Sequence, residues 1–369
     1  MSELLNEHKA IIKVIGVGGG GGNAIAEMAG EIQDVEFWLA NTDAMALAKS
    51  TIENKLQLGD ELTKGLGAGA DPEVGRQATE ETKDQIYEIV KGTDLLFLAA
   101  GMGGGTGTGA TPVFAEVAKE LGILTVAVVT KPFSFEGTKR MQHASTGIEL
   151  LSKNVDSLII VPNNKLLSVL GKSVSLVSAF RSANMVLKGS VQGISDLITR
   201  PGLINVDFAD VRTVMTEMGM AMMGTGTAKG DMRAREAAEA ALSSPLLEDI
   251  DLSGAKGVLV NISGGLDMTI GEFESVGDTI RHFTTDSATV VVGTVIDPEL
   301  NDELKVTVVV TGLELQGSGR RSFASRSTVS RSERPTFSRQ VPQPIIDTED
   351  HIETDVLDVP AFLRQEEEI

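Results

Sequence analysis

Short apolar runs and amphipathic stretches alternate along the first half of the chain. Runs with the length of buried strands fall at residues 11–17, 35–39, 95–100, 124–129 and 157–161. Helical stretches separate them, and strands connected in this way pair in parallel beneath helices on both faces. The pattern therefore predicts an α/β fold, which binds ligands at the carboxyl ends of its strands.

A long amphipathic helix is predicted from residue 173 to residue 199. Its apolar residues form one stripe with spacings of four and three: Leu176, Phe180, Ala183, Leu187, Val191, Ile194 and Ile198. Arg200, Pro201 and Gly202 end it. At 1.5 Å per residue the helix is about 40 Å long, which suits a connection between two domains.

The pattern after this helix predicts a smaller α+β domain. Helices are expected at 232–243 and 269–283, and strands at 257–262, 289–295 and 305–311. We expect no concentration of titratable groups within this domain. Beyond Gly317 the apolar periodicity stops and Gly, Ser, Arg, Pro and Gln dominate, which is typical of a disordered linker.

A glycine segment that starts at Gly101 reads Gly-Met-Gly-Gly-Gly-Thr-Gly-Thr-Gly and follows the third apolar run. Glycines let successive backbone N–H groups point at one anion, and Thr106 and Thr108 add hydroxyl donors. We expect the next helix to begin with Thr111 as N-cap and Pro112 at its first position. A flexible linker rarely lies between a buried strand and a capped helix, so the segment predicts a phosphate-binding loop.

A second glycine segment at 16–23 leads from the first strand into a helix predicted at 24–29, with Gly30 as its C-cap. It matches the dinucleotide pattern G-x-G-x-x-G, and Asp43 falls near the position of the acidic ribose ligand of that fold. A nicotinamide-dependent oxidoreductase is therefore an alternative. Two glycine loops on neighbouring strands, however, suit a longer triphosphate chain.

A third glycine-rich segment lies at 65–72, before a polar helix predicted at 73–91. Both a binding role and an ordinary loop fit this segment. The chain has no G-x-x-x-x-G-K-[ST] sequence, which excludes a P-loop protein.

The amino-acid composition excludes or disfavours several kinds of catalytic site and binding partner. The 369 residues include no cysteine and four scattered histidines, which excludes thiolate chemistry and disfavours a His-built metal site or a Ser-His-Asp triad. A net charge of −20 disfavours binding to nucleic acid, because the phosphate backbone would be repelled. No apolar run reaches the roughly 20 residues that span a bilayer, and no secretory h-region is present. We expect a cytoplasmic protein that does not insert into a membrane.

Two pairs of side chains with helical spacing could contact a nucleotide. Glu136 and Arg140 form either a surface ion pair, or a carboxylate for ribose hydroxyls beside a guanidinium for phosphate. Phe180 and Asn184 are either a core residue and a tolerated polar residue, or an aromatic plane and an amide that stack on a purine and read its edge.

Asp207 and Asp210 follow the long helix, at the start of a helix predicted to run to Met218. Their spacing fits helix capping. Two carboxylates on one face could also orient a water molecule. The rise per residue puts them about 35 Å from Asn184, so they could act only on a nucleotide presented by a neighbouring molecule.

Taken together, several segments resemble the bacterial FtsZ family of tubulin-like division GTPases. They are GVGGGGGNA from Gly16, NTDA from Asn41, GMGGGTGTGA from Gly101, KPFSFEG from Lys131, NVDFADVR from Asn205 and LDVPAFLR from Leu357. The resemblance covers residues 11–316 and the terminal peptide, and GGGTGTG is the superfamily signature. It implies a Rossmann-like parallel-sheet GTP-binding domain at 1–172, a central helix at 173–202, an α+β domain at 203–316, a disordered linker at 317–353 and a partner-docking peptide at 354–369.

The resemblance also implies roles for individual residues. Guanine would contact Phe180 and Asn184, the ribose and phosphates would contact Glu136 and Arg140, and the phosphates would be bound by Gly19, Gly20, Gly21, Gly22, Asn23, Gly103, Gly104, Gly105, Thr106 and Gly107. The implied cofactors are GTP or GDP, Mg²⁺ held through the phosphates, and K⁺. Asp207 and Asp210, with Asn205, would complete the active site of the next subunit in a head-to-tail filament by orienting the attacking water.

The terminal peptide from Leu357 to Arg364 is a short apolar segment on a tether, a form typical of docking motifs. It resembles the family's peptide for the membrane-tethering proteins FtsA and ZipA, with Val359 where isoleucine is frequent. Met185 also departs from the family, which often has an acidic residue there, near guanine. The implied function is an assembly-dependent GTPase of the midcell division ring, with a filament-forming paralogue that hydrolyses poorly as the alternative.

Overall fold

The structure, a computed structural model, describes residues 9–171, 173–200, 202–204, 206–217, 219–247, 254–284 and 288–313. All of them belong to one compact unit, Met1–Ser318. The predicted linker at 317–353, the docking peptide at 354–369 and Asn205 lie outside the described residues. None of the described helices is long and apolar enough to cross a membrane.

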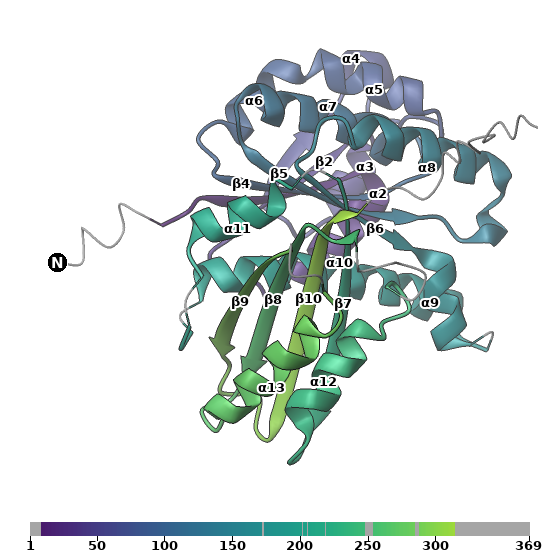
Figure 1. Ribbon diagram of the computed structural model, residues 1–369. Helices are drawn as coiled ribbons and strands as arrows, with labels where there is room; N and C mark the ends of the chain where they lie inside the picture. Colours follow the sequence, from purple (N-terminus) through teal and green to yellow (C-terminus); the bar gives the residue numbers. More distant parts are fainter. Residues whose placement is uncertain are drawn as a thin grey trace, which may run out of the picture. The chain divides into compact units, whose positions relative to one another are not determined.

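The first half of the chain forms the predicted parallel sheet (Figure 1). Its order is β3-β2-β1-β4-β5-β6, with β1 (Ile12–Val17), β2 (Glu36–Asn41), β3 (Asn54–Gln57), β4 (Leu95–Gly101), β5 (Leu124–Lys131) and β6 (Ser157–Pro162). The direction of strand order reverses between β1 and β4, and parallel sheets bind ligands beyond the carboxyl ends of such strands. The predicted strands are confirmed, whereas β3 has no predicted counterpart because Leu56 is its one buried residue.

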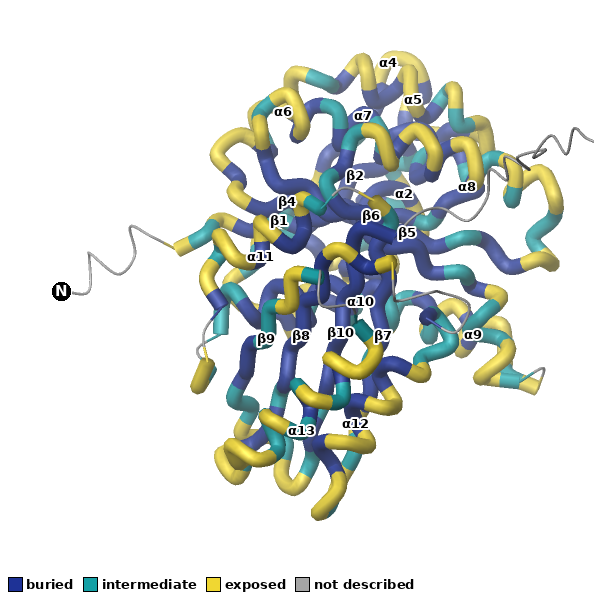
Figure 2. Tube along the Cα trace, viewed as in Figure 1, coloured by how far each residue is buried: buried dark blue, intermediate teal, exposed yellow. Residues whose placement is uncertain are grey.

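Helices cover both faces of this sheet. They are α2 (Gly18–Met28), α3 (Ala44–Lys49), α4 (Asp60–Thr63), α5 (Pro72–Glu81), α6 (Lys83–Val90), α7 (Thr106–Glu120), α8 (Thr138–Leu151) and α9 (Asn163–Leu170). Alternate side chains of β4 point to opposite cores: Phe97 packs in the cluster of α2, and Leu98 in the cluster of α6, α7 and α8. Both residues are fully buried, which explains why the strand has a continuous apolar sequence. Figure 2 shows this buried interior.

The polar helix predicted at 73–91 is two helices, α5 and α6, which meet at Thr82. The Thr82 hydroxyl donates to the Ala78 carbonyl and accepts from the Gly59 N–H. These two buried hydrogen bonds fix the junction between α5 and α6 to the loop that contains Gly59.

The second half of the chain extends the same sheet. β7 (Gly219–Lys229) pairs in parallel with β6, and β10 (Glu303–Leu313), β8 (Gly257–Gly264) and β9 (Thr289–Ile296) follow in that order. On one face α12 (Arg233–Leu242) and α13 (Ile270–Arg281) pack with Val306, Val308 and Val310, and on the other α11 (Phe208–Met215) lies in the cluster of Val309. The two parts are therefore joined by backbone hydrogen bonds as well as by a helix.

The central helix α10 (Leu176–Thr199) begins at Ser175, whose hydroxyl caps the Ser178 N–H. It packs against strands of both parts, and Asn261 of β8 donates to the Gly193 carbonyl. Its apolar stripe is buried from Ala183 to Ile194 and partly buried at Ile198, but Leu176 is 58% exposed and Phe180 is 40% exposed. The expectation of a stripe buried along its whole length is wrong at this first turn, which leaves Phe180 accessible.

The expectation that the second part holds no concentration of titratable groups is also wrong. Arg233 on α12 is buried and bonds to both Glu272 and Asp267, and its hydrogen bond lowers the pKa of Glu272. At the end of α10, burial raises the pKa of Asp196 and lowers the pKa of Lys305. Periodicity did not predict these clusters, because their members come from different elements.

Candidate functional site

Helices begin inside both predicted phosphate-binding segments, and residues 102–105 of the second segment form a turn before its helix. α2 begins at Gly18 and α7 at Thr106, so Thr111 and Pro112 lie inside α7 and the expected cap at Thr111 is wrong. The expected C-cap at Gly30 is wrong too, since Ala29 ends α2 in a right-handed conformation. Neither helix has a side-chain cap. Their first N–H groups are therefore free to bind an anion.

Close packing explains why glycine occupies these turns despite its low helix propensity. A Cβ at Gly20 would lie 3.1 Å from the Gly101 Cα, and a Cβ at Gly18 would lie 2.9 Å from the Gly107 nitrogen. A Cβ at Gly21 would overlap the Ala99 carbonyl oxygen. The two helix starts can thus approach each other and the ends of β1 and β4 only without side chains.

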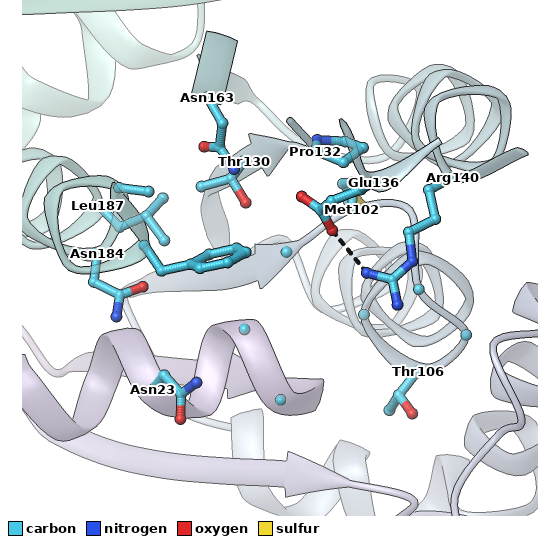
Figure 3. Close-up of a pocket in the computed structure, with 18 residues that line it drawn as sticks. Asn23, Met102, Thr106, Thr130, Pro132, Glu136, Arg140, Asn163, Asn184 and Leu187 are labelled. Atoms are coloured by element: carbon cyan, nitrogen blue, oxygen red, sulfur yellow. Dashed lines mark hydrogen bonds and ion pairs between the residues drawn. The ribbon is translucent and has the colours of Figure 1, made fainter. Parts of the chain in front are cut away.

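A cavity of about 430 Å³ lies where α2 and α7 begin. It is lined by most of the residues predicted to bind nucleotide: Gly19, Gly20, Asn23, Gly104, Gly105, Thr106, Gly107, Glu136, Arg140, Phe180 and Asn184. Figure 3 shows that they come from opposite sides, with Asn23 on α2, Asn184 on α10 and Arg140 on α8. Two helix N-termini and a guanidinium in one cavity make an anion site with hydrogen-bond donors.

Three predicted residues do not line this cavity. Gly21 packs beneath Ala99, Gly22 contacts Leu39 on the side away from the cavity, and Gly103 lies against Pro132 and the Arg140 backbone. Glycine repeats do not distinguish a residue that faces a ligand from one that allows close packing. Gly19 and Gly104 do face the open space, since no atom lies within 4 Å of a Cβ built there.

The cavity also has lining residues that the sequence did not predict: Gly101, Met102, Thr130, Pro132, Asn163, Ala183 and Leu187. Asn163 is 3% exposed, and its Oδ1 has no hydrogen-bond partner among the described residues. A buried amide oxygen without a partner is costly, which favours a contact with a ligand. Its position directly after β6, at the carboxyl edge of the sheet, was the available signal.

The ion pair between Glu136 and Arg140 exists, and both residues line the cavity. Arg140 Nη1 donates to Glu136 Oε2 at 2.7 Å, and the Phe133 N–H donates to Glu136 Oε1 at 2.9 Å. The Glu136 side chain is 13% exposed and that of Arg140 is 51% exposed. The two alternatives given by the sequence are therefore compatible, because the pair holds the guanidinium at the cavity.

Phe180 and Asn184 form the end of the cavity on α10. The Phe180 ring meets Phe133 edge-on at 5.2 Å, and Phe133 stacks on Phe135 at 5.0 Å. Asn184 Nδ2 donates to Glu27 Oε1 of α2 at 3.4 Å. This end offers an aromatic plane and an amide, the groups expected for a base.

The threonines and the third glycine segment support the phosphate side. Thr108 accepts a hydrogen bond from the Gly103 N–H; because it is buried and does not line the cavity, the expected role of its hydroxyl as a phosphate donor is wrong. Thr106 lines the cavity and bonds to Thr42 at 2.6 Å. Ala68 of the third segment packs against Gly105 behind the cavity, and none of residues 65–72 line it.

Asp207 and Asp210 lie away from this cavity. Asp207 caps α11 by accepting from the Asp210 N–H at 2.8 Å, and both residues are exposed. The carboxylate of Asp210 has no hydrogen bond or ion pair with any described residue. The expected separation of about 35 Å from Asn184 is too long, because α10 ends at Thr199 and Val206 packs beside Leu197 against Gly293. The rise along α10 gives about 20 Å, which still keeps both carboxylates outside the cavity.

Two family models match the chain. The Tubulin/FtsZ family GTPase domain matches residues 11–171, and the FtsZ family C-terminal domain matches residues 219–314. The cell division protein FtsZ of Coxiella burnetii is 62% identical, with 97% of each chain covered. The chain belongs to the FtsZ family. The FtsZ of Buchnera aphidicola from Acyrthosiphon pisum is 58% identical over 99% of this chain and 98% of its own. A solved FtsZ dimer of M. jannaschii has a TM-score of 0.80 at 42% identity, over 84% of this chain and 90% of that one.

Membership of the FtsZ family confirms the prediction of a tubulin-like GTPase of cell division with GTP and GDP as its nucleotides. The nicotinamide alternative is excluded by the same match. The glycine pattern that suggested this alternative belongs to the start of α2, which packs against the start of a second glycine-rich helix, α7. A dinucleotide fold needs one such glycine segment and not two.

Proposed function

We propose that GTP occupies the cavity with its phosphates between the starts of α2 and α7 and its base at Phe180 and Asn184. The observation that carries this proposal is the pair of helix N-termini without side-chain caps that line one cavity. Gly19 and Gly104 leave room for phosphate oxygens, and Arg140 adds a positive charge. Asn163 supplies a further acceptor near the base or ribose.

Hydrolysis takes place between two subunits in this proposal. Asp207 and Asp210 are exposed at one end of the molecule, about 20 Å along α10 from the base end of the cavity. The preceding segment is fixed to β9, because the Ile204 N–H donates to the Thr294 hydroxyl. The two carboxylates, with Asn205, then orient water on the nucleotide of the next subunit, while glycine amides hold the triphosphate.

Exposed apolar side chains at both ends support head-to-tail assembly. Phe135 at the cavity is 58% exposed and Leu66 is 85% exposed, whereas Leu203, four residues before Asp207, is 71% exposed. Two different surfaces that fit each other make a heterologous contact, which propagates as a filament when it does not close. The M. jannaschii FtsZ was solved as a dimer, which agrees with self-association.

Mg²⁺ fits this site as an ion held mainly by phosphate oxygens and water. The described residues contain no group of three or more His, Asp or Glu side chains that could hold a metal, and Mg²⁺ in nucleotide sites commonly keeps its waters. When bound, it would neutralise charge on the triphosphate. A requirement for K⁺ stays a prediction.

We propose the domain division predicted from the sequence, with boundaries at 172, 202, 316 and 353. The family matches at 11–171 and 219–314 fall within it. We also propose that the peptide from Leu357 to Arg364 binds tethering proteins such as FtsA and ZipA, and that the filament lies in the cytoplasm at midcell.

The test is GTP hydrolysis per molecule as a function of protein concentration. A shared site requires turnover to rise steeply above the assembly threshold, and Asp210→Ala should still form filaments but hydrolyse slowly. Turnover that is independent of concentration would contradict the shared site. Slow turnover of the unaltered chain within filaments would instead support the hydrolysis-poor paralogue.

A further inference from the structure

The amide of Asn184 can face the base in two ways with opposite chemistry. Its Oδ1 only accepts hydrogen bonds and its Nδ2 only donates them. The Watson–Crick edge of guanine presents N1–H and N2–H₂ donors, whereas adenine presents N1 as an acceptor at the corresponding place. Whichever atom faces the cavity therefore decides which purine is favoured.

Glu27 on α2 determines this orientation. Its Oε1 lies 3.4 Å from Asn184 Nδ2, across the contact between α2 and α10. An ionised carboxylate can only accept, so the amide atom that faces Glu27 must be the nitrogen. The carbonyl oxygen is then left for the cavity, where Asn184 is a lining residue.

A second bridge lies four residues further along both segments. Lys188 of α10 forms an ion pair with Glu31, which lies in the turn that follows α2. Leu187 between the two bridges is 1% exposed and belongs to the core that α2 shares with α10. The Glu27–Asn184 contact is therefore part of a packed helix interface and not an isolated surface pair.

We propose that Glu27 is a positioning residue for base selection: it turns the Asn184 amide so that Oδ1 accepts from guanine. Met185, the next residue along α10, is 58% exposed and has only a weak acceptor, its thioether sulfur. The inference rests on the proposed placement of the base at Phe180 and Asn184. It adds a residue from the phosphate helix to the recognition of the purine.

The test uses the full chain freed of nucleotide, without Mg²⁺ and below the assembly threshold. Affinities for GTP and ATP are measured by competition with a fluorescent nucleotide, and the readout is the ratio of the two dissociation constants. Glu27→Lys replaces an acceptor by a donor and so turns the amide around. The preference for GTP should fall on the order of 10- to 100-fold. The added charge attracts both triphosphates equally and cancels in the ratio.

Two further variants separate orientation from structural damage. Glu31→Lys makes the same charge change one turn away and should keep the preference. Glu27→Lys combined with Asn184→Asp should restore it, because the introduced carboxylate can pair with the introduced lysine through one oxygen and accept from guanine through the other. Asn184→Asp alone sets two carboxylates against each other, so the double variant should bind GTP better than either single variant. Thermal unfolding checks that each variant is folded.

The outcomes are distinct. Loss of the preference in Glu27→Lys with rescue by the second substitution supports the proposal. An unchanged ratio in Glu27→Lys, or loss without rescue, overturns it and leaves the proposed function intact. If the unaltered chain does not prefer GTP to ATP, the placement of the base is wrong and the proposed site falls with it.

Discussion

The cavity end and the acidic end of this molecule are built in opposite ways. At the cavity the candidate binding groups are mainly backbone N–H groups at two helix starts, which contact each other through glycines and leave no room for side chains. At the acidic end the candidate groups are exposed side chains on one short helix. The cavity is preorganised within one chain, because packed backbone fixes its donors.

The acidic end is incomplete within one chain. Asp207 caps a helix, and the Asp210 carboxylate has no partner among the described residues. Both side chains are exposed, so the described residues form no closed pocket around either of them. Leu203, four residues before Asp207, is also exposed to solvent. This difference fits the proposal that one end holds the nucleotide and the other end acts only when a second molecule covers it.

The largest effect is expected from a methyl group placed in the backbone contact. Gly21→Ala puts a Cβ into the Ala99 carbonyl and should destabilise the chain by about 3 kcal/mol and abolish nucleotide binding. Gly19→Ala is the matched control, since its Cβ meets no protein atom. It should keep the stability of the chain and lower GTP affinity about tenfold, because the methyl enters the ligand space. Urea unfolding without nucleotide measures the stability of each variant, and a GTP titration measures its affinity. Equal stability of both variants would contradict the packing argument.

A smaller effect separates the two roles of Asp207. Asparagine caps helices as well as aspartate does, so Asp207→Asn should leave thermal stability unchanged and reduce GTP hydrolysis about 100-fold in assembled protein. Asp207→Ala should in addition cost about 1 kcal/mol of stability. Melting curves and phosphate release check these values. Normal hydrolysis by Asp207→Asn would show that this residue serves the helix alone.

Much of the fold followed from local pattern. The apolar runs predicted the strands β1, β2, β4, β5 and β6. All of these except the first half of β2 are largely buried on both faces, so their sequences are continuously apolar. β7 was missed: its sequence mixes Met, Gly and Thr, and its place in the sheet is decided by pairing with β6 and β10. The starts of α2 and α7 were missed for a related reason, since tertiary packing outweighs the low helix propensity of glycine.

Site residues that belong to a sequence motif could be predicted, whereas residues identified only by their contacts in the fold could not. Glycine spacing located both helix starts, but it also included Gly21, Gly22 and Gly103, which pack against protein. Asn163 and Glu27 were missed, because neither belongs to a repeat: Asn163 is marked by its unpartnered oxygen at the cavity, and Glu27 by its contact with Asn184, far away in sequence. The spacing of the two aspartates on α11 fitted capping, and the cap is present; the catalytic role proposed for them depends on a second chain.

The most direct test of the central claim mixes two variants that are inactive for different reasons. Gly104→Asp places a carboxylate in the phosphate space and keeps the acidic helix, whereas Asp210→Ala keeps the cavity and loses the acid. Each alone should hydrolyse almost no GTP. An equimolar mixture should recover up to about a quarter of normal turnover, the fraction of random head-to-tail contacts that join an intact cavity to an intact acidic helix. A mixture that co-assembles yet hydrolyses no more than the sum of its parts would contradict catalysis shared between two subunits.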